Sequence, residues 1–168
     1  MLISRIYDRV GKVKVIGAHT LKGYALAFNC GYPPACMYAN MVEREGASIE
    51  GVLYELTERQ IAQLDKYEVY PFNYQKIYFY DAVKDAVIFA YVATSDFKPR
   101  RVGKPTLDYL NILIQGCKDF KLTSTLTYLL TYKSQNYKLK NKSDFVESVT
   151  SIGKSSFKVR DGRVVKVW

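Results

Sequence analysis

Apolar residues near the start of the chain recur at the spacing of an amphipathic helix. Positions 2, 3, 6, 7 and 10 are apolar, which predicts a helix over residues 1–10. Asp8 and Arg9 fall between these positions, so we expect both side chains to face solvent. Gly11 predicts the end of the helix, because glycine readily takes the left-handed conformation.

Segments with strand character follow this helix. Valines alternate with lysines over residues 12–18, which predicts a strand, and His19 is expected in the turn behind it. Residues 21–29 and 35–42 predict two further strands. The charged segment 43–46, which ends in glycine, is expected to close the last of them.

The middle of the chain carries the most specific local pattern. Residues 51–56 are short, apolar and flanked by turn residues, which predicts a buried strand. Thr57 and Gln60 have the spacing of a capping box and predict the start of a helix. Pro71 cannot extend that helix, so it is expected to end by Glu68. On position alone, a Glu at a helix end is usually a solvated charge.

Two alternating segments and two helical segments complete the first 130 residues. Residues 74–80 and 86–94 flank a turn and predict a hairpin, and residues 95–104 predict a polar loop. Thr106 predicts the N-cap of a helix that runs to about residue 118. Its apolar stripe leaves Tyr109 to one side, free to point elsewhere. A second helix is expected over residues 124–133.

The end of the chain differs from the rest. Residues 133–142 are rich in Lys, Ser and Asn, which predicts a linker or a mobile arm, and residues 144–152 predict a short helix. Residues 157–168 contain Asp161-Gly162 between alternating apolar residues, which predicts a hairpin with a type I′ turn. One face of this hairpin is expected to pack on the body of the protein.

Length and composition indicate one globular domain without a membrane span. The chain has 168 residues, 48% hydrophobic and 24% charged, and no apolar run approaches the ~20 residues of a membrane-crossing helix. The first residues lack the layout of a secretory signal. Cys30, Cys36, Cys117 and the single His19 lack metal-ligand spacing. We therefore expect reduced thiols, no metal and a cytoplasmic location.

Positive charge is concentrated near the end of the chain. The formal net charge is +9, and residues 131–168 hold 9 Lys/Arg against 3 Asp/Glu. Such a basic tail is either an ordinary solvated surface or a binding surface for an anionic partner, nucleic acid included. The sequence leaves both interpretations open.

Several short motifs occur together in a specific order and spacing. Together they resemble the gamma-glutamylcyclotransferase-like superfamily over roughly residues 1–130. The motifs are Gly23-Tyr24-Ala25-Leu26-Ala27-Phe28, Gly51-Val52-Leu53-Tyr54-Glu55-Leu56, Leu64-Asp65-x-x-Glu68, Tyr74 at the head of a strand, and Pro105-Thr106-x-x-Tyr109-Leu110 followed by Gly116.

The resemblance implies an α+β fold, a mixed β-barrel with flanking helices, here with a C-terminal β-hairpin extension. It also implies a division of the chain. Residues 1–130 would form the gamma-glutamylcyclotransferase-like domain, and residues 131–168 a basic linker and hairpin packed on that body.

The same resemblance implies a reaction. The free α-amine of a gamma-glutamyl group attacks its own γ-carbonyl, which releases 5-oxoproline and an amine without a metal or organic cofactor. Glu68 matches the catalytic position and would transfer the proton. Tyr74 and Tyr109 match positions where family tyrosines line the substrate pocket. Each tyrosine is equally compatible with ordinary packing, since the chain contains 15.

Two departures from the family pattern stand out. Val69 follows Glu68 where the family has glycine. The family also begins with a strand that runs into Tyr-Gly-Ser-Asn, whose backbone amides cradle the gamma-glutamyl group, and Met1 falls where that motif would end. The cradle is missing from the chain as given, so either the true start lies upstream or the protein lacks this loop. If the loop is lacking, a strand of the barrel would also be absent, and the C-terminal hairpin is a candidate replacement.

The sequence thus leaves two functions in competition. The first is an enzyme that acts on a small gamma-glutamyl substrate, with Glu68 as general acid and base. The second is a non-catalytic binding protein on the same fold, which would hold an anionic small molecule, nucleic acid or protein. Whether the chain is an enzyme stays open at this point.

Overall fold

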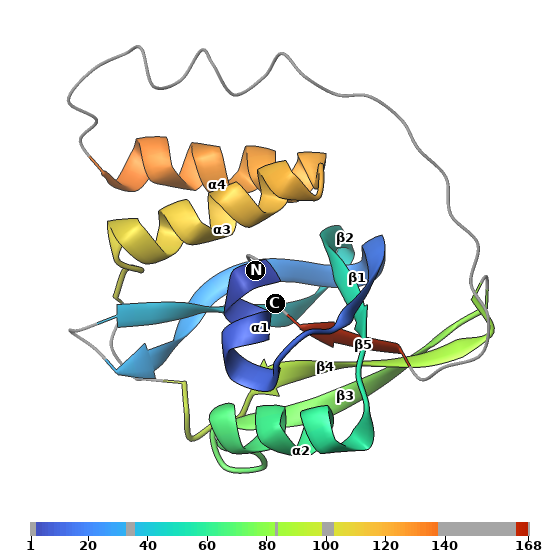
Figure 1. Ribbon diagram of the computed structural model, residues 1–168. Helices are drawn as coiled ribbons and strands as arrows, with labels where there is room; N and C mark the ends of the chain where they lie inside the picture. Colours follow the sequence, from blue (N-terminus) through green and yellow to red (C-terminus); the bar gives the residue numbers. More distant parts are fainter. Residues whose placement is uncertain (1–2, 33–35, 83, 99–102, 138–163, 168) are drawn as a thin grey trace.

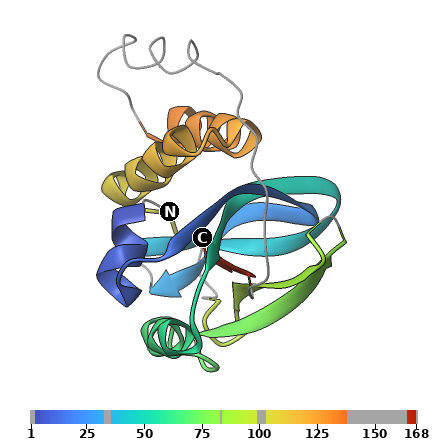
Figure 2. The same cartoon turned by 45° about the vertical axis from the view of Figure 1, so that its right-hand side comes forward.

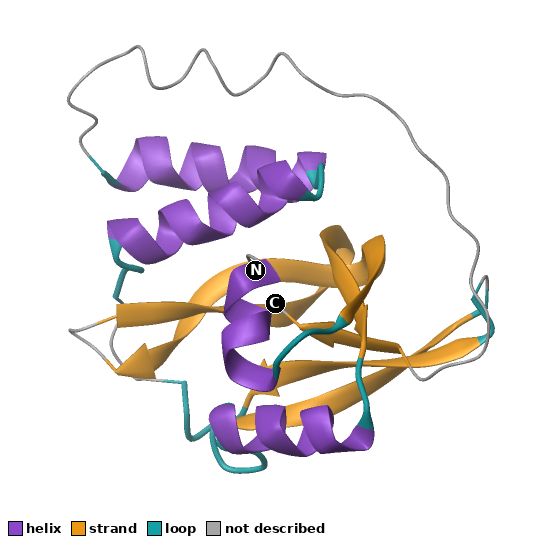
Figure 3. Cartoon of the chain, viewed as in Figure 1, coloured by secondary structure: helices purple, strands orange, loops and turns teal. Residues whose placement is uncertain are grey.

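A computed structural model describes residues 3–32, 36–82, 84–98, 103–137 and 164–167 of the chain. Helices and strands follow one another in the order α1 (Ile3–Val10), β1 (Lys14–Tyr32), β2 (Cys36–Glu55), α2 (Glu58–Tyr67), β3 (Tyr74–Asp81), β4 (Ala86–Ala93), α3 (Leu107–Asp119), α4 (Thr123–Asn136) and β5 (Val164–Val167). The architecture is α+β, with helices packed around one sheet (Figure 3).

The described strands form one five-stranded mixed sheet in the order β1-β2-β5-β4-β3. β5 is antiparallel to β2, with Val167 opposite Val52, and parallel to β4, with Val164 opposite Ile88. A segment from the end of the chain therefore lies in the middle of the sheet. The other strand and the turn of the predicted hairpin, and the predicted helix over 144–152, lie outside the described residues. The division of the chain at residue 130 stays a prediction.

β1 and β2 are longer than the sequence predicted, because two expected turns are parts of strands. His19 lies within β1, opposite Gly51, and segment 43–46 lies within β2. The pairing register shifts between Lys22 and Tyr24, and Gly23 between them has a φ of 78°. A bulge at such a glycine bends a strand without ending it. The residues that predicted turns therefore form irregular positions within the continuous β1–β2 hairpin.

The expected closed barrel is wrong for the described strands, since the sheet ends at β1 and β3 without pairing between them. Side chains bridge the two ends instead. The rings of Tyr24 and Phe79 meet edge to face at 5.3 Å, and His19 Nδ1 lies 3.5 Å from Asp81 Oδ2. The sheet is thus curled enough for its outer strands to touch, while backbone hydrogen bonds do not close it.

The main core lies between the sheet and the helices. α3 and α4 pack together on one side, and α1 lies between α2 and α3 in both views (Figures 1 and 2). The core combines buried side chains from these helices and from β2 and β4, among them Ile6, Val52, Tyr54, Leu64, Phe89, Leu110 and Leu129.

Capping groups fix the helices relative to one another. The Gln60 backbone N–H donates to Thr57 Oγ1, and the Thr57 N–H donates to Gln60 Oε1, which confirms the predicted capping box. Gln60 Nε2 also donates to the carbonyls of Val10 at 3.3 Å and Lys12 at 2.8 Å. These carbonyls lie at the end of α1 and just beyond it. One side chain thus starts α2 and holds α1 beside it.

α4 is anchored on the sheet by an acidic residue. Glu50 Oε2 in β2 accepts hydrogen bonds from the backbone N–H groups of Ser124 and Thr125, at 2.8 and 3.2 Å. A carboxylate at a helix N-terminus accepts hydrogen bonds from backbone N–H groups that lack a partner within the helix, and it interacts favourably with the positive end of the helix dipole. This contact compensates for Leu122, which occupies the N-cap without a side-chain hydrogen bond.

Candidate functional site

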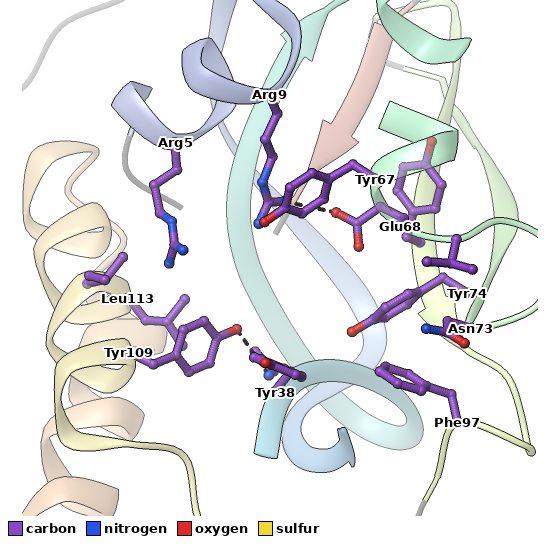
Figure 4. Close-up of a pocket in the computed structure, with 14 residues that line it drawn as sticks. Arg5, Arg9, Tyr38, Tyr67, Glu68, Asn73, Tyr74, Phe97, Tyr109 and Leu113 are labelled. Atoms are coloured by element: carbon purple, nitrogen blue, oxygen red, sulfur yellow. Dashed lines mark hydrogen bonds and ion pairs between the residues drawn. The ribbon is translucent and has the colours of Figure 1, made fainter. Parts of the chain in front are cut away.

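A cavity of about 380 Å³ opens where α1, α2 and α3 approach the sheet. Its lining comes from α1, β2, the end of α2, the start of β3 and the segment between them, β4, the loop after β4, and α3 (Figure 4). Glu68, Tyr74 and Tyr109 all line it. Three residues that the sequence singled out from different elements therefore face the same space, which is large enough for a small molecule.

Glu68 is the C-cap residue of α2. Its backbone N–H donates to the Leu64 carbonyl at 2.8 Å, so the end of the helix fixes the position of the residue. Val69 then takes a φ of 53°, in the left-handed region. This reversal ends α2 as a glycine would, and it explains why a glycine suits the position after the acid. The side chain of Glu68 turns into the cavity (Figure 4).

Arg9 is the direct partner of Glu68. Its Nη1 donates to Glu68 Oε1 at 2.9 Å, and both side chains are only 14% exposed. The Arg9 guanidinium also lies 3.8 Å from the centre of the Tyr67 ring. The expectation that Arg9 faces solvent is wrong, because α1 packs between α2 and α3 and turns this face of the helix inward. Asp8 is exposed, as expected.

The environment of Glu68 has two opposing effects on its proton affinity. Burial raises the pKa of Glu68 above its ordinary value of 4.5, and the nearby Arg9 charge lowers it. Burial is the larger effect, so the pKa is raised overall. A carboxyl group with a raised pKa releases and regains a proton closer to neutral pH than an exposed one does.

Tyr74 forms the wall beside Glu68. Its hydroxyl lies 3.5 Å from Cys30 Sγ, and its ring packs against Phe97 at 5.2 Å between centroids. Burial, followed by the influence of Cys30, raises the pKa of Tyr74 far above its ordinary value. The hydroxyl therefore stays protonated at any physiological pH and is able to act as a hydrogen-bond donor.

Tyr109 faces the cavity from α3. The backbone N–H of Ala39 donates to its hydroxyl oxygen at 3.2 Å, and the Tyr38 ring meets its ring edge to face at 5.5 Å. Tyr109 thus joins α3 to β2 at the edge of the cavity. The sequence placed it off the apolar stripe of its helix, and the structure confirms that orientation.

A charged network lies behind the cavity wall. Tyr91, which lines the cavity from β4, donates a hydrogen bond from its hydroxyl to Asp65 Oδ1. Lys76 Nζ lies 2.6 Å from the same oxygen and is almost buried. Burial and the contact with Asp65 raise the pKa of Tyr91. The aspartate of the Leu64-Asp65 motif therefore ties α2 to β3 and β4 and supports the position of Glu68.

The sequence did not single out Arg5 and Arg9 as residues of the site. The two are four residues apart and therefore lie on one face of α1, the face turned away from its apolar residues. Such a face is usually solvated, so the helix pattern alone indicates no site. The cavity that these arginines line is completed by residues much later in the chain, among them Glu68 and Leu113.

The described residues offer neither a metal cluster nor a membrane span. Among them, no three His, Cys, Asp or Glu side chains lie close enough together to hold a metal ion. No helix in the described ranges has both the length and the apolar character needed to cross a bilayer.

Comparison with known proteins gives a consistent result. Residues 4–110 match the model of a protein family described as gamma-glutamyl cyclotransferase, AIG2-like. A search of curated protein sequences found no match.

Solved structures with a similar fold include three at 20% sequence identity. A gamma-glutamyl cyclotransferase aligns over 85% of this chain and 88% of its own, with a TM-score of 0.63. An uncharacterised human protein aligns over 83% and 86%, with a TM-score of 0.61. YkqA from Bacillus subtilis aligns over 78% of this chain and 48% of its own, with a TM-score of 0.58. At this identity the similarity establishes the fold alone.

Proposed function

The chain belongs to the AIG2-like gamma-glutamyl cyclotransferase family, and on that premise we propose that it releases 5-oxoproline and an amine from a small gamma-glutamyl compound. Glu68 is the proposed general acid and base. The observation that carries this proposal is the position of the Glu68 carboxylate, half-enclosed in a cavity of about 380 Å³ that Tyr74 and Tyr109 also line.

The proposed reaction is an intramolecular acyl transfer. The α-amine of the gamma-glutamyl group attacks the γ-carbonyl carbon, so one carbon–nitrogen bond forms. Glu68 accepts the proton that the attacking nitrogen loses. The bond to the leaving nitrogen then breaks as Glu68 donates that proton to it. The carboxylate ends in its starting state, and no further reactant is needed.

The surroundings of Glu68 suit such a proton transfer. Burial raises its pKa toward the pH at which the reaction would run. Arg9 holds the carboxylate at 2.9 Å and keeps its orientation fixed. Because nucleophile and electrophile belong to one molecule, the protein mainly has to hold the substrate in its folded shape.

The two tyrosines have proposed roles in holding the substrate. The Tyr74 hydroxyl, protonated because burial raises its pKa, would donate a hydrogen bond to the γ-carbonyl oxygen as negative charge develops there. Tyr109 would form the opposite wall, held by Ala39. Figure 4 shows the Tyr74 and Tyr109 side chains reaching into the cavity from opposite sides.

The test is release of 5-oxoproline from a panel of gamma-glutamyl amines and gamma-glutamyl dipeptides. We expect turnover by the wild type and its loss in Glu68→Gln, which keeps the size of the side chain but cannot accept the proton. Glu58→Gln on the exposed side of α2 is the matched control and should retain activity. Absence of 5-oxoproline from every substrate, or full activity of Glu68→Gln, would refute the proposal.

A binding protein on the same fold is the second candidate, and one observation favours it. The Glu68 carboxylate is already engaged with Arg9, as in a site that is structural rather than reactive. If the protein is a binding protein, a ligand should bind to wild type and Glu68→Gln with the same affinity, and neither protein should release 5-oxoproline. A cytoplasmic location and an anionic partner for the basic residues 131–168 stay predictions.

A further inference from the structure

Two arginines reach into the cavity from α1, and they have different surroundings. Arg9 turns toward Glu68, whereas Arg5 extends on the side of Tyr109 and Leu113 (Figure 4). Arg5 is half-buried, one helical turn before Arg9. The arginines therefore divide the cavity into an end with an acid and an end without one.

The charges in the cavity do not balance. The described lining contains two arginines and one carboxylate, that of Glu68, which already pairs with Arg9. Within the described part of the chain, no acidic side chain forms an ion pair with Arg5. The cavity thus has a positive charge in excess at the end formed by α1 and α3.

An arginine in this position is suited to an anion. Its planar guanidinium carries a positive charge and presents donors in a fork that matches a carboxylate. The apolar wall formed by Leu113 and the Tyr109 ring lowers the local dielectric constant, which strengthens an ion pair at this point. The volume of about 380 Å³ restricts the ligand to a small molecule.

We propose that Arg5 binds a carboxylate of the ligand, at the end of the cavity opposite the Arg9–Glu68 pair. The identity of that carboxylate rests on the proposed function: it is the α-carboxylate of the gamma-glutamyl group, which the product 5-oxoproline retains. Arg5 thereby selects small acids over neutral molecules of the same shape.

The experiment titrates the protein with three probes and follows binding by nuclear magnetic resonance and calorimetry. The probes are 5-oxoproline, 2-pyrrolidinone, which is the same ring without the carboxylate, and glutarate, a five-carbon diacid unable to react. Arg5→Gln is compared with Arg5→Lys, which keeps the charge but not the fork. Arg59→Gln removes an equal charge from the exposed face of α2 and is the matched control.

We expect Arg5→Gln to weaken binding of 5-oxoproline and glutarate roughly 10- to 100-fold, the range for one charge-assisted hydrogen-bonded contact. Arg5→Lys should fall between Arg5→Gln and wild type, which also keeps the test valid if Arg5→Gln folds poorly. Binding of 2-pyrrolidinone should be equally weak in all variants, and Arg59→Gln should match the wild type.

The outcomes separate this inference from the proposed reaction. If 5-oxoproline binds wild type and Arg5→Gln with equal affinity, the inference is wrong and the reaction is untouched. If glutarate binds through Arg5 while no gamma-glutamyl compound is turned over, the carboxylate site stands and the reaction is wrong. If no acid binds better than 2-pyrrolidinone, the inference is overturned.

Discussion

The Arg9 guanidinium donates a 2.9 Å hydrogen bond to the Glu68 carboxylate, 59 residues further along the chain. This contact joins the first helix of the protein to the end of the second. It also sets the proton affinity of Glu68, because the Arg9 charge lowers a pKa that burial raises. Changes to either residue should therefore alter both activity and stability in a pH-dependent way.

Arg9→Gln should shift the pH dependence of the proposed reaction. Without the positive charge, the pKa of Glu68 rises further, so a smaller fraction is ionised and ready to accept a proton at a given pH. The acidic limb of kcat/KM should move to higher pH. Measurement of kcat/KM across the pH range tests this, with Arg59→Gln as control. An unmoved acidic limb would show that Arg9 does not tune the reacting group.

Stability should depend on pH through Glu68. The pKa of Glu68 is higher in the native state than its ordinary value of 4.5, so the native state binds this proton more tightly than the unfolded state. The stabilisation is complete below 4.5 and is lost as the pH rises through the raised native value. Relative to Glu68→Gln, the wild type should become less stable from acidic to neutral pH.

Urea unfolding of both proteins over that pH range measures the difference, since glutamine does not titrate. A wild type that gains stability over Glu68→Gln as the pH rises would mean that Arg9 outweighs burial. In Glu68→Gln, Arg9 loses its charged partner at every pH. This loss changes the size of the difference in unfolding free energy between the two proteins, but not how that difference varies with pH.

Tyr109→Phe should destabilise the protein by about 1–2 kcal/mol, because the backbone N–H of Ala39 loses the hydroxyl that it donates to. Tyr128→Phe is the matched control in the next helix, where the side chain is 41% exposed and should tolerate the change. Chemical denaturation gives both values. Equal stability of the two variants would contradict a structural role for the Tyr109 hydroxyl.

Val69→Gly should increase stability. A β-branched residue at a φ of 53° is strained by about 1–3 kcal/mol, while glycine costs roughly 0.5–1 kcal/mol in chain entropy. We expect a net gain of about 1 kcal/mol in the free energy of unfolding. Val87→Gly is the control, since Val87 is similarly exposed but lies in a regular strand, and this change should destabilise. Destabilisation by both changes would exclude strain at Val69.

Local chemistry predicted the central part of the fold well. The Thr57–Gln60 capping box, the end of α2 at Glu68 and the β3–β4 hairpin are set by residues close together in the sequence, and all three were confirmed. The common cavity around Glu68, Tyr74 and Tyr109 agrees with the positions that the family resemblance indicated. Their roles in a reaction stay proposals.

Features that depend on distant segments were not predictable in the same way. The turn signals at His19 and at 43–46 became parts of continuous strands, because β1 and β2 pair on both sides of each signal and absorb the glycines as bulges. Arg9 was expected at the surface because its own helix has only one apolar stripe. Its burial comes from the end of α2, where Tyr67 and Glu68 contact it, and α2 comes much later in the chain.

The place of β5 between β2 and β4 has a consequence for how the protein is made. On the ribosome, every other strand that the structure describes is synthesised before β5, so the facing edges of β2 and β4 stay unpaired until β5 emerges. During that interval the backbone N–H and C=O groups at these two edges are unpaired, and a strand from another copy, or a chaperone, is able to bind there. Premature termination of translation before β5 would leave the edges of β2 and β4 permanently unpaired, and such shortened products should aggregate rather than stay in solution.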